Sequence, residues 1–194
     1  MKSSRMLALA LLTGVATLAT VALLVYRLWV TAQPPASSGI PPGLLASQQL
    51  SPEGAQKAVD RLFSLTLPDL AGQPQAIAQW RGKVLVVNYW ASWCAPCVKE
   101  MPVFSRMHAH YSGWGVQFVG IGLDDAEKMR AFVKSTPVSY PLLVSDFASQ
   151  SSVLEIKGLP LTLVIGRDGR LEMTHLGPLD EATLEPVLKR LIGP

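Results

Sequence analysis

The sequence contains few of the residues on which several common protein classes depend. It has two cysteines in 194 residues, which excludes a small scaffold held by several disulfides and a four-cysteine zinc module. Charged residues make up only 16% of the chain, against about 25% in an average soluble protein. The net charge of +3 comes from Lys2, Arg5 and Arg27, because basic and acidic residues are equal in number after residue 30. We therefore expect no basic face and no nucleic-acid partner.

The N-terminal region consists mainly of one long apolar segment. Residues 6–26 form a run of 21 residues without a charge. As a helix it would span about 31 Å, close to the ~30 Å hydrocarbon core of a bilayer. Two of the three basic residues precede the run, so the positive-inside rule keeps the N-terminus in the cytoplasm and exports the rest. We predict a transmembrane signal-anchor over residues 6–30. A cleaved signal peptide is the alternative, because Val30-Thr31-Ala32 offers small residues for cleavage.

A tether and a short helix are predicted after the anchor. Residues 33–43 contain four prolines, two glycines and two serines, a composition that neither pairs its backbone nor buries a core. Ser51-Pro52-Glu53 then combines an N-cap serine with proline at the first helical position. This pattern predicts a helix that ends at about Arg61, with the globular part beginning at Leu62.

The globular part alternates segments typical of strands and of helices. A central strand is predicted at 84–90, because this run is almost entirely apolar and rich in β-branched and aromatic residues. The order of elements predicts an α/β fold with a mixed sheet, since the last two strands flank turn residues typical of a hairpin. The predicted strands are 62–67, 84–90, 116–123, 162–165 and 171–175, and the predicted helices are 95–111, 126–135, 147–156 and 180–192.

The segment Trp93-Cys94-Ala95-Pro96-Cys97 lies between the central strand and a helix. A cysteine at a helix N-terminus is favoured as the thiolate, which is the species that attacks disulfides. We predict that Cys94 is the nucleophile and that Cys97, one turn later, resolves the mixed disulfide. A purely structural disulfide with a two-residue spacer would stabilise little. The three histidines complete no recognised zinc spacing, so neither a metal nor a cofactor beyond the cysteine pair is predicted.

Two motifs in this order resemble a known family. Residues 84–104, VLVVNYWASWCAPCVKEMPVF, resemble the active-site region of the thioredoxin superfamily, and more specifically the membrane-anchored TlpA/ResA/DsbE-type thiol–disulfide oxidoreductases. Residues 158–162 and the turn at 167–169 resemble the family's cis-proline loop and hairpin. The resemblance covers roughly 62–192 and implies a thioredoxin-like fold with helices on both faces of a mixed central sheet. Leu161 departs from the small polar residue of many relatives, and we expect its bulk to alter the substrate groove.

The resemblance also implies further site residues. A cis peptide bond is expected at Leu159–Pro160, where the backbone would pair with an extended substrate. Asn88 stands where cytoplasmic thioredoxins have a buried acid, and an amide cannot accept the proton. Glu100, three residues after Cys97, is the candidate proton acceptor, because a desolvated carboxyl beside the cysteines has a raised pKa. The other groove residues are expected to be Trp93, Ala95 and Pro96.

Together these features predict a cytoplasmic N-terminus at 1–5, a signal-anchor at 6–30, a tether with a short helix at 31–61 and a thioredoxin-like domain at 62–194. The resemblance implies a single-pass protein of the bacterial inner membrane with this domain on the periplasmic side. It implies a disulfide reductase whose partners are protein disulfides, such as those of apocytochrome c, and a membrane thiol electron donor.

Three other functions remain open at this level. The motif does not fix the direction of electron flow, so a disulfide oxidase or isomerase is the second interpretation. A thiol peroxidase would need a Pro-x-x-x-Thr-x-x-Cys setting, whereas Trp90-Ala91-Ser92-Trp93 precedes Cys94 here. A non-enzymatic metallochaperone or binding module would need additional methionine, histidine or cysteine ligands around the pair.

Overall fold

The computed structural model describes residues 21–27, 52–151 and 153–193. Residues 21–27 are helical, and the rest of the predicted signal-anchor at 6–30, together with residues 31–51 of the tether region, lies outside the described residues. Within the described ranges, no helix combines the length and the apolar character needed to cross a membrane. The elements discussed below all belong to the compact unit Ala46–Pro194.

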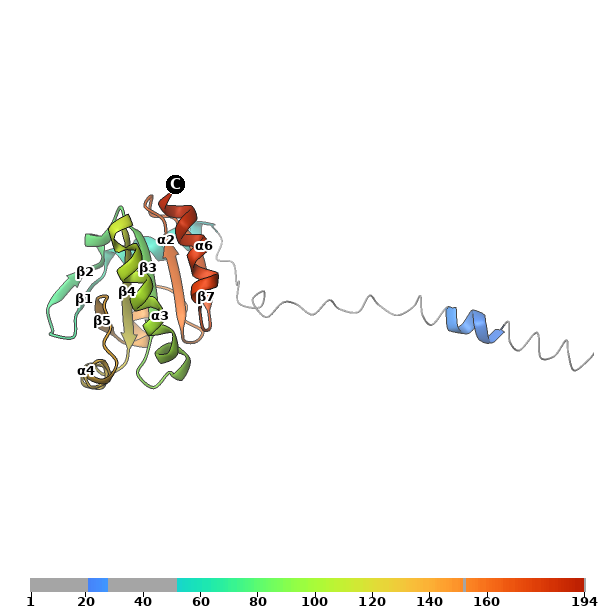
Figure 1. The fold of residues 1–194 in the computed structure, drawn as a ribbon, viewed down its shortest axis with the longest axis horizontal. Helices are drawn as coiled ribbons and strands as arrows, with labels where there is room; N and C mark the ends of the chain where they lie inside the picture. The colour runs from blue at the N-terminus through green and yellow to red at the C-terminus, as the bar shows by residue number, and fades with distance from the viewer. Residues whose placement is uncertain (1–20, 28–51, 152, 194) are drawn as a thin grey trace, which may run out of the picture. The chain divides into compact units, whose positions relative to one another are not determined.

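A five-stranded mixed sheet forms the centre of this unit (Figure 1). Its strand order is β5-β4-β3-β6-β7, with β3, β4 and β5 parallel to one another and β6 and β7 antiparallel to their neighbours. The expected α/β fold with a mixed sheet is therefore confirmed. The strands are β3 (Val84–Trp90), β4 (Val116–Leu123), β5 (Leu142–Ser145), β6 (Leu161–Ile165) and β7 (Leu171–Leu176), and a separate hairpin pairs β1 (Thr66–Pro68) with β2 (Pro74–Ala76).

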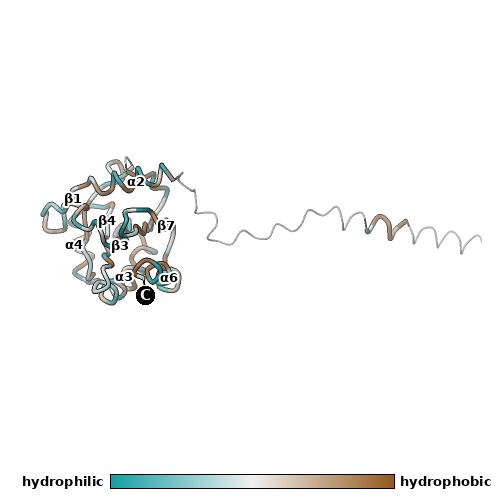
Figure 2. The backbone as a smooth tube through the Cα atoms, turned by 90° about the horizontal axis from the view of Figure 1, so that it is seen from above, coloured by the Kyte–Doolittle hydropathy of each residue, from teal (hydrophilic) through white to brown (hydrophobic). Residues whose placement is uncertain are grey.

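Helices cover both faces of the sheet, as expected. Figure 2 shows α2 on one side of the strands, with α3 and α6 on the other. The helices are α2 (Pro52–Ser64), α3 (Ala95–Tyr111), α4 (Ala126–Ser135), α5 (Phe147–Ser151) and α6 (Glu181–Ile192), with short 3₁₀ turns η1 (Ile77–Trp80) and η2 (Ser112–Trp114).

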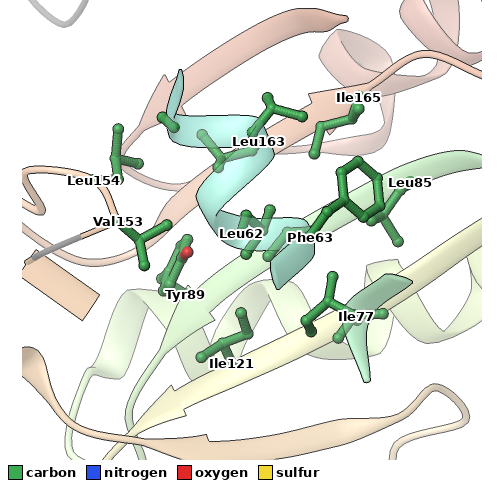
Figure 3. Close-up of a cluster of buried hydrophobic side chains, with 14 of the residues drawn as sticks. Leu62, Phe63, Ile77, Leu85, Tyr89, Ile121, Val153, Leu154, Leu163 and Ile165 are labelled. Carbon is green, nitrogen blue, oxygen red and sulfur yellow. The ribbon is translucent and has the colours of Figure 1, made fainter. Parts of the chain in front are cut away.

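The central strand β3 is buried along its whole length because it contributes to two cores. Alternate side chains of a strand point to opposite faces of the sheet. Leu85, Val87 and Tyr89 pack with α2 in the cluster shown in Figure 3, whereas Val86 and Trp90 pack with α3 and α6. The alternation also turns Asn88 toward α3, and this polar position is the one that reaches the site described below.

Two predicted elements differ from the structure. Residues 62–67 were expected to form a strand, but 62–64 are the last turn of α2 and only 66–68 are extended. Ala58, Val59, Leu62 and Phe63 have helical spacing and all lie in the core, so burial of this face favours the helix over the local alternation. The boundary predicted between residues 61 and 62 thus falls inside a packed helix.

The segment before β6 also differs from the expectation. A helix was predicted over 147–156, but α5 ends at Ser151. The backbone N–H groups of Val153 and Leu154 both donate to the carbonyl of Gln150, at 2.9 and 3.0 Å, and both side chains turn into the core. Strand β5 comes just before this segment and was not predicted.

Candidate active site

The two cysteines lie at the start of α3, where the chain leaves the carboxyl end of β3. They form a disulfide with Cα atoms 5.3 Å apart. Cys94 is the N-cap residue of α3, and its sulfur accepts the backbone N–H of Cys97 at 3.4 Å. One backbone donor of the first helical turn, the Cys97 N–H, therefore points at the Cys94 sulfur, and the N-terminus of a helix is an environment that favours a thiolate once the disulfide is reduced.

The two sulfur-bearing residues differ in their access to solvent. Cys94 is 5% exposed and Cys97 is fully buried at 0%. Trp93, which was predicted as a groove residue, lies just before them and is 64% exposed. A reacting disulfide can approach Cys94, whereas Cys97 is accessible only from within the protein.

Glu100 lies one turn after Cys97 on α3 and is buried, with 4% of its surface exposed. Its Oε1 accepts a hydrogen bond from Asn88 Nδ2 at 2.8 Å, and its Oε2 accepts one from the Leu179 N–H at 3.0 Å. Burial raises the pKa of Glu100 to about 7, although the two hydrogen bonds oppose that increase. The carboxyl group can therefore gain or lose a proton near neutral pH.

A cavity of about 510 Å³ opens beside Glu100. Ala95, Pro96 and Lys99 line it from α3, and Pro178 to Asp180 line it from the loop before α6. Ala95 and Pro96 were predicted as groove residues, and the structure places both of them with Glu100 around this cavity. The loop at Leu179 could not be assigned to the site from the sequence, because it lies 79 residues from Glu100.

The proline loop meets the same end of the sheet. The Leu159–Pro160 bond is cis, as expected. Leu161 pairs with Tyr89 near the carboxyl end of β3. Pro160 therefore lies at the same end of the sheet as Cys94. Leu161 itself is buried in the core beneath α2, and the expectation that its bulk alters the groove is wrong, because strand alternation turns it to the other face.

A further carboxylate braces the turn that carries the cysteines. Asp124, at the end of β4, accepts hydrogen bonds from the backbone N–H and the hydroxyl of Ser92. Burial acts to raise the pKa of Asp124, but the hydrogen bonds from Ser92 and Asp125 outweigh it and hold that pKa below its ordinary value. Asp124 was not among the predicted site residues, and the adjacent carboxyl ends of β3 and β4 were the available signal.

No group of three or more histidine, cysteine, aspartate or glutamate side chains that could hold a metal occurs in the part of the chain that the structure describes. The site consists of the cysteine pair, one buried carboxyl group that can gain or lose a proton near neutral pH, and the groove residues around them. These groups suit the exchange of a dithiol with a disulfide.

Known proteins are similar to this chain over most of its length. The family model described as Redoxin matches residues 53–191. The thiol-disulfide oxidoreductase ResA of Halalkalibacterium halodurans is 26% identical over 139 residues, which is 71% of this chain and 78% of that protein. The ResA of Bacillus subtilis is 25% identical over 132 residues, 68% of this chain and 73% of that protein.

Solved structures agree with this assignment. A thiol:disulfide interchange protein of the thioredoxin family from Chlorobium tepidum superposes with a TM-score of 0.61 at 25% identity, covering 67% of this chain and 94% of that one. A thioredoxin-related protein from Neisseria meningitidis serogroup B gives 0.57 at 32% identity, covering 64% and 97%. The chain therefore belongs to the Redoxin family and is a thiol–disulfide oxidoreductase of the thioredoxin superfamily.

Proposed function

We propose that this protein is an exported, membrane-tethered disulfide reductase in which Cys94 is the nucleophile, Cys97 the resolving thiol and Glu100 the proton acceptor. The observation that carries the proposal is the unequal burial of the two cysteines, with the buried one a single turn from a buried carboxyl group. The curated relatives named ResA support thiol–disulfide chemistry.

The reaction would proceed in two exchanges. The Cys94 thiolate attacks one sulfur of a target disulfide, a mixed disulfide forms, and the other target sulfur leaves as a thiolate that takes up a proton. Cys97 then loses its proton to the Glu100 carboxylate and attacks the Cys94 sulfur, which releases the second target sulfur as a thiolate that takes up a proton from water. Two electrons have passed from the dithiol to the target, and the Cys94–Cys97 disulfide remains.

The groove would position an extended polypeptide for this reaction. In this proposal the backbone at Leu159, beside the cis Pro160, pairs with the substrate, and Trp93, Ala95 and Pro96 contact its side chains. The substrates are protein disulfides, such as those of apocytochrome c, and a thiol donor in the membrane restores the dithiol. No cofactor other than the cysteine pair takes part.

The proposed tether predicts where the domain is located. A reporter that is active only outside the cytoplasm, such as alkaline phosphatase, should be active when it is fused after residue 50, because the basic residues before the apolar run retain the N-terminus inside. The same fusion without residues 6–26 is the matched control and should be inactive. An active cytoplasmic reporter at this junction would refute the topology, and a mature protein beginning near Gln33 would replace the anchor by a cleaved signal.

The direction of electron flow is tested by the equilibrium reduction potential. We expect the full-length protein, equilibrated with dithiothreitol or glutathione buffers, to show a midpoint near the value of about −270 mV known for thioredoxin. The double variant Cys94→Ser/Cys97→Ser is the control and should show no transition. A midpoint near about −120 mV, typical of a strong oxidant, would favour the disulfide oxidase instead.

A further inference from the structure

The Glu100 carboxylate is held between two distant parts of the chain. Asn88 Nδ2, from the central strand β3, donates to Oε1 at 2.8 Å, and the Leu179 N–H, from the loop before α6, donates to Oε2 at 3.0 Å. Asn88 and Leu179 are both buried. Each carboxylate oxygen therefore accepts a hydrogen bond from a buried donor.

A third residue orients the amide of Asn88. Its Nδ2 also donates to Thr162 Oγ1 at 3.2 Å, and Thr162 lies opposite Asn88 on the neighbouring strand β6. The two hydrogens of this nitrogen are thus used by Glu100 and Thr162. Asn88 Oδ1 has no hydrogen-bond partner among residues 52–151 and 153–193, although it is buried.

Leaving a buried carbonyl oxygen unpaired is unfavourable. A half turn of the amide would bring Oδ1 toward Glu100 and remove the donor from the carboxylate. The observed orientation suits an ionised carboxylate, which accepts hydrogen bonds and donates none. Burial disfavours the charged form of Glu100. The hydrogen bond from the Asn88 amide in this orientation acts in the opposite direction and favours the charged form.

We propose that Asn88 is a positioning residue that sets the pH at which Glu100 takes up its proton, and that Thr162 fixes the amide in the orientation this requires. Asn88 does not accept the catalytic proton in this scheme. It acts through Glu100, and its consequence for disulfide exchange rests on the function proposed above. Because a hydrogen bond to the charged form lowers the pH of protonation, loss of this donor raises it.

Other ionisable groups also face Glu100. Lys99 on α3 and Asp180 before α6 line the same cavity. Tyr140, before β5, has its pKa raised first by burial and then by the charge of Glu100, so it stays neutral in the pH range of interest. The cysteines do not titrate while they form the disulfide. The oxidised protein therefore allows Glu100 to be titrated without the thiols.

The test is a ¹³C NMR titration of the Glu100 side-chain carboxyl in the oxidised full-length protein, assigned by its absence in Glu100→Gln. We expect Asn88→Leu to move the midpoint upward by about one pH unit, as loss of a hydrogen bond to a charged group predicts. In Asn88→Asp, which keeps the size of the side chain, the first proton should be taken up at a still higher pH because two carboxylates share the site. A midpoint unchanged in Asn88→Leu would overturn the proposal.

Thr162→Val tests the orienting role with little change in shape. It should shift the midpoint in the same direction by a smaller amount, and the exposed Thr174 of β7 provides the matched control, since Thr174→Val should leave the titration unchanged. Equal midpoints in the two threonine variants would overturn the role of Thr162. These titrations involve no thiol, so their failure is distinct from failure of the proposed function, which would appear as unaltered exchange in Glu100→Gln.

Discussion

Replacing Cys97 by serine should convert the protein into a covalent trap for its substrates. Cys94 would still attack a disulfide, but no second thiol would release the product, so mixed disulfides should accumulate and turnover should fall by several orders of magnitude. The substitution removes one sulfur from a fully buried position and replaces it by an oxygen of similar reach. The measurement is non-reducing electrophoresis together with the rate of reduction of a model disulfide.

Cys94→Ser is the matched control for this trap. It removes the more accessible of the two sulfurs and leaves Cys97 buried at 0% exposure, so it should trap very little. The assigned roles would be reversed if Cys94→Ser trapped substrates and Cys97→Ser did not. Normal reduction of the model disulfide by both variants would exclude the cysteine pair as the reacting groups.

Glu100→Gln should change both the thiol chemistry and the pH dependence of stability. In the reduced protein the negative charge of Glu100 opposes the formation of thiolates nearby, so the thiol pKa values should fall when the charge is removed. Carboxyl and thiols titrate as a coupled system in the wild type, and the variant should lose one step from the alkylation profile. The measurement is the rate of thiol alkylation and of disulfide exchange against pH, and superimposable profiles would contradict the role of Glu100.

The raised pKa of Glu100 also determines the direction in which the free energy of unfolding changes with pH. The pKa of Glu100 is raised from 4.5 to about 7 by burial, so between these values the folded state keeps a proton that the unfolded chain releases. The free energy of unfolding should therefore fall by about 3 kcal/mol as the pH rises from 4.5 to 7. In Glu100→Gln this contribution should be absent, so the variant should equal or exceed the wild type above pH 7. Chemical denaturation of the oxidised proteins at pH 5 and pH 8 measures the difference.

The parts of the site that were predictable from the sequence are those set by local spacing. Cys94, Cys97 and Glu100 lie within two turns of one helix, and a strand followed by the cysteine motif fixes where that helix starts. Thr162 and the Leu179 N–H lie 74 and 79 residues away from the groups they contact, so only the sheet register and the loop before α6 reveal them. The sequence identifies Asn88 only as a residue that cannot accept the proton, because its contacts with Glu100 and Thr162 depend on the fold.

The fold shows the same division between local and distant information. The buried strands β3 and β4 and the β6–β7 hairpin follow from local patterns, which agree with their tertiary environment. Residues 62–67 carry a local alternation that favours a strand, and packing of α2 on the sheet overrides it. The position of Leu161 next to Pro160 in the sequence predicts a groove residue, but a one-residue step along a strand changes the face to which a side chain points.

The unequal burial of the two cysteines also constrains the kinetics of the whole cycle. Electrons leave through the Cys94 sulfur in the proposed reaction, and a reductant from outside has only the same sulfur to attack, because Cys97 is inaccessible. Under the proposed function we therefore expect donor and acceptor proteins to compete for one atom and to form no ternary complex with this domain. The proposed function therefore predicts a ping-pong scheme, in which an excess of the oxidised donor should slow the reduction of substrate and the domain should leave one partner before it meets the next.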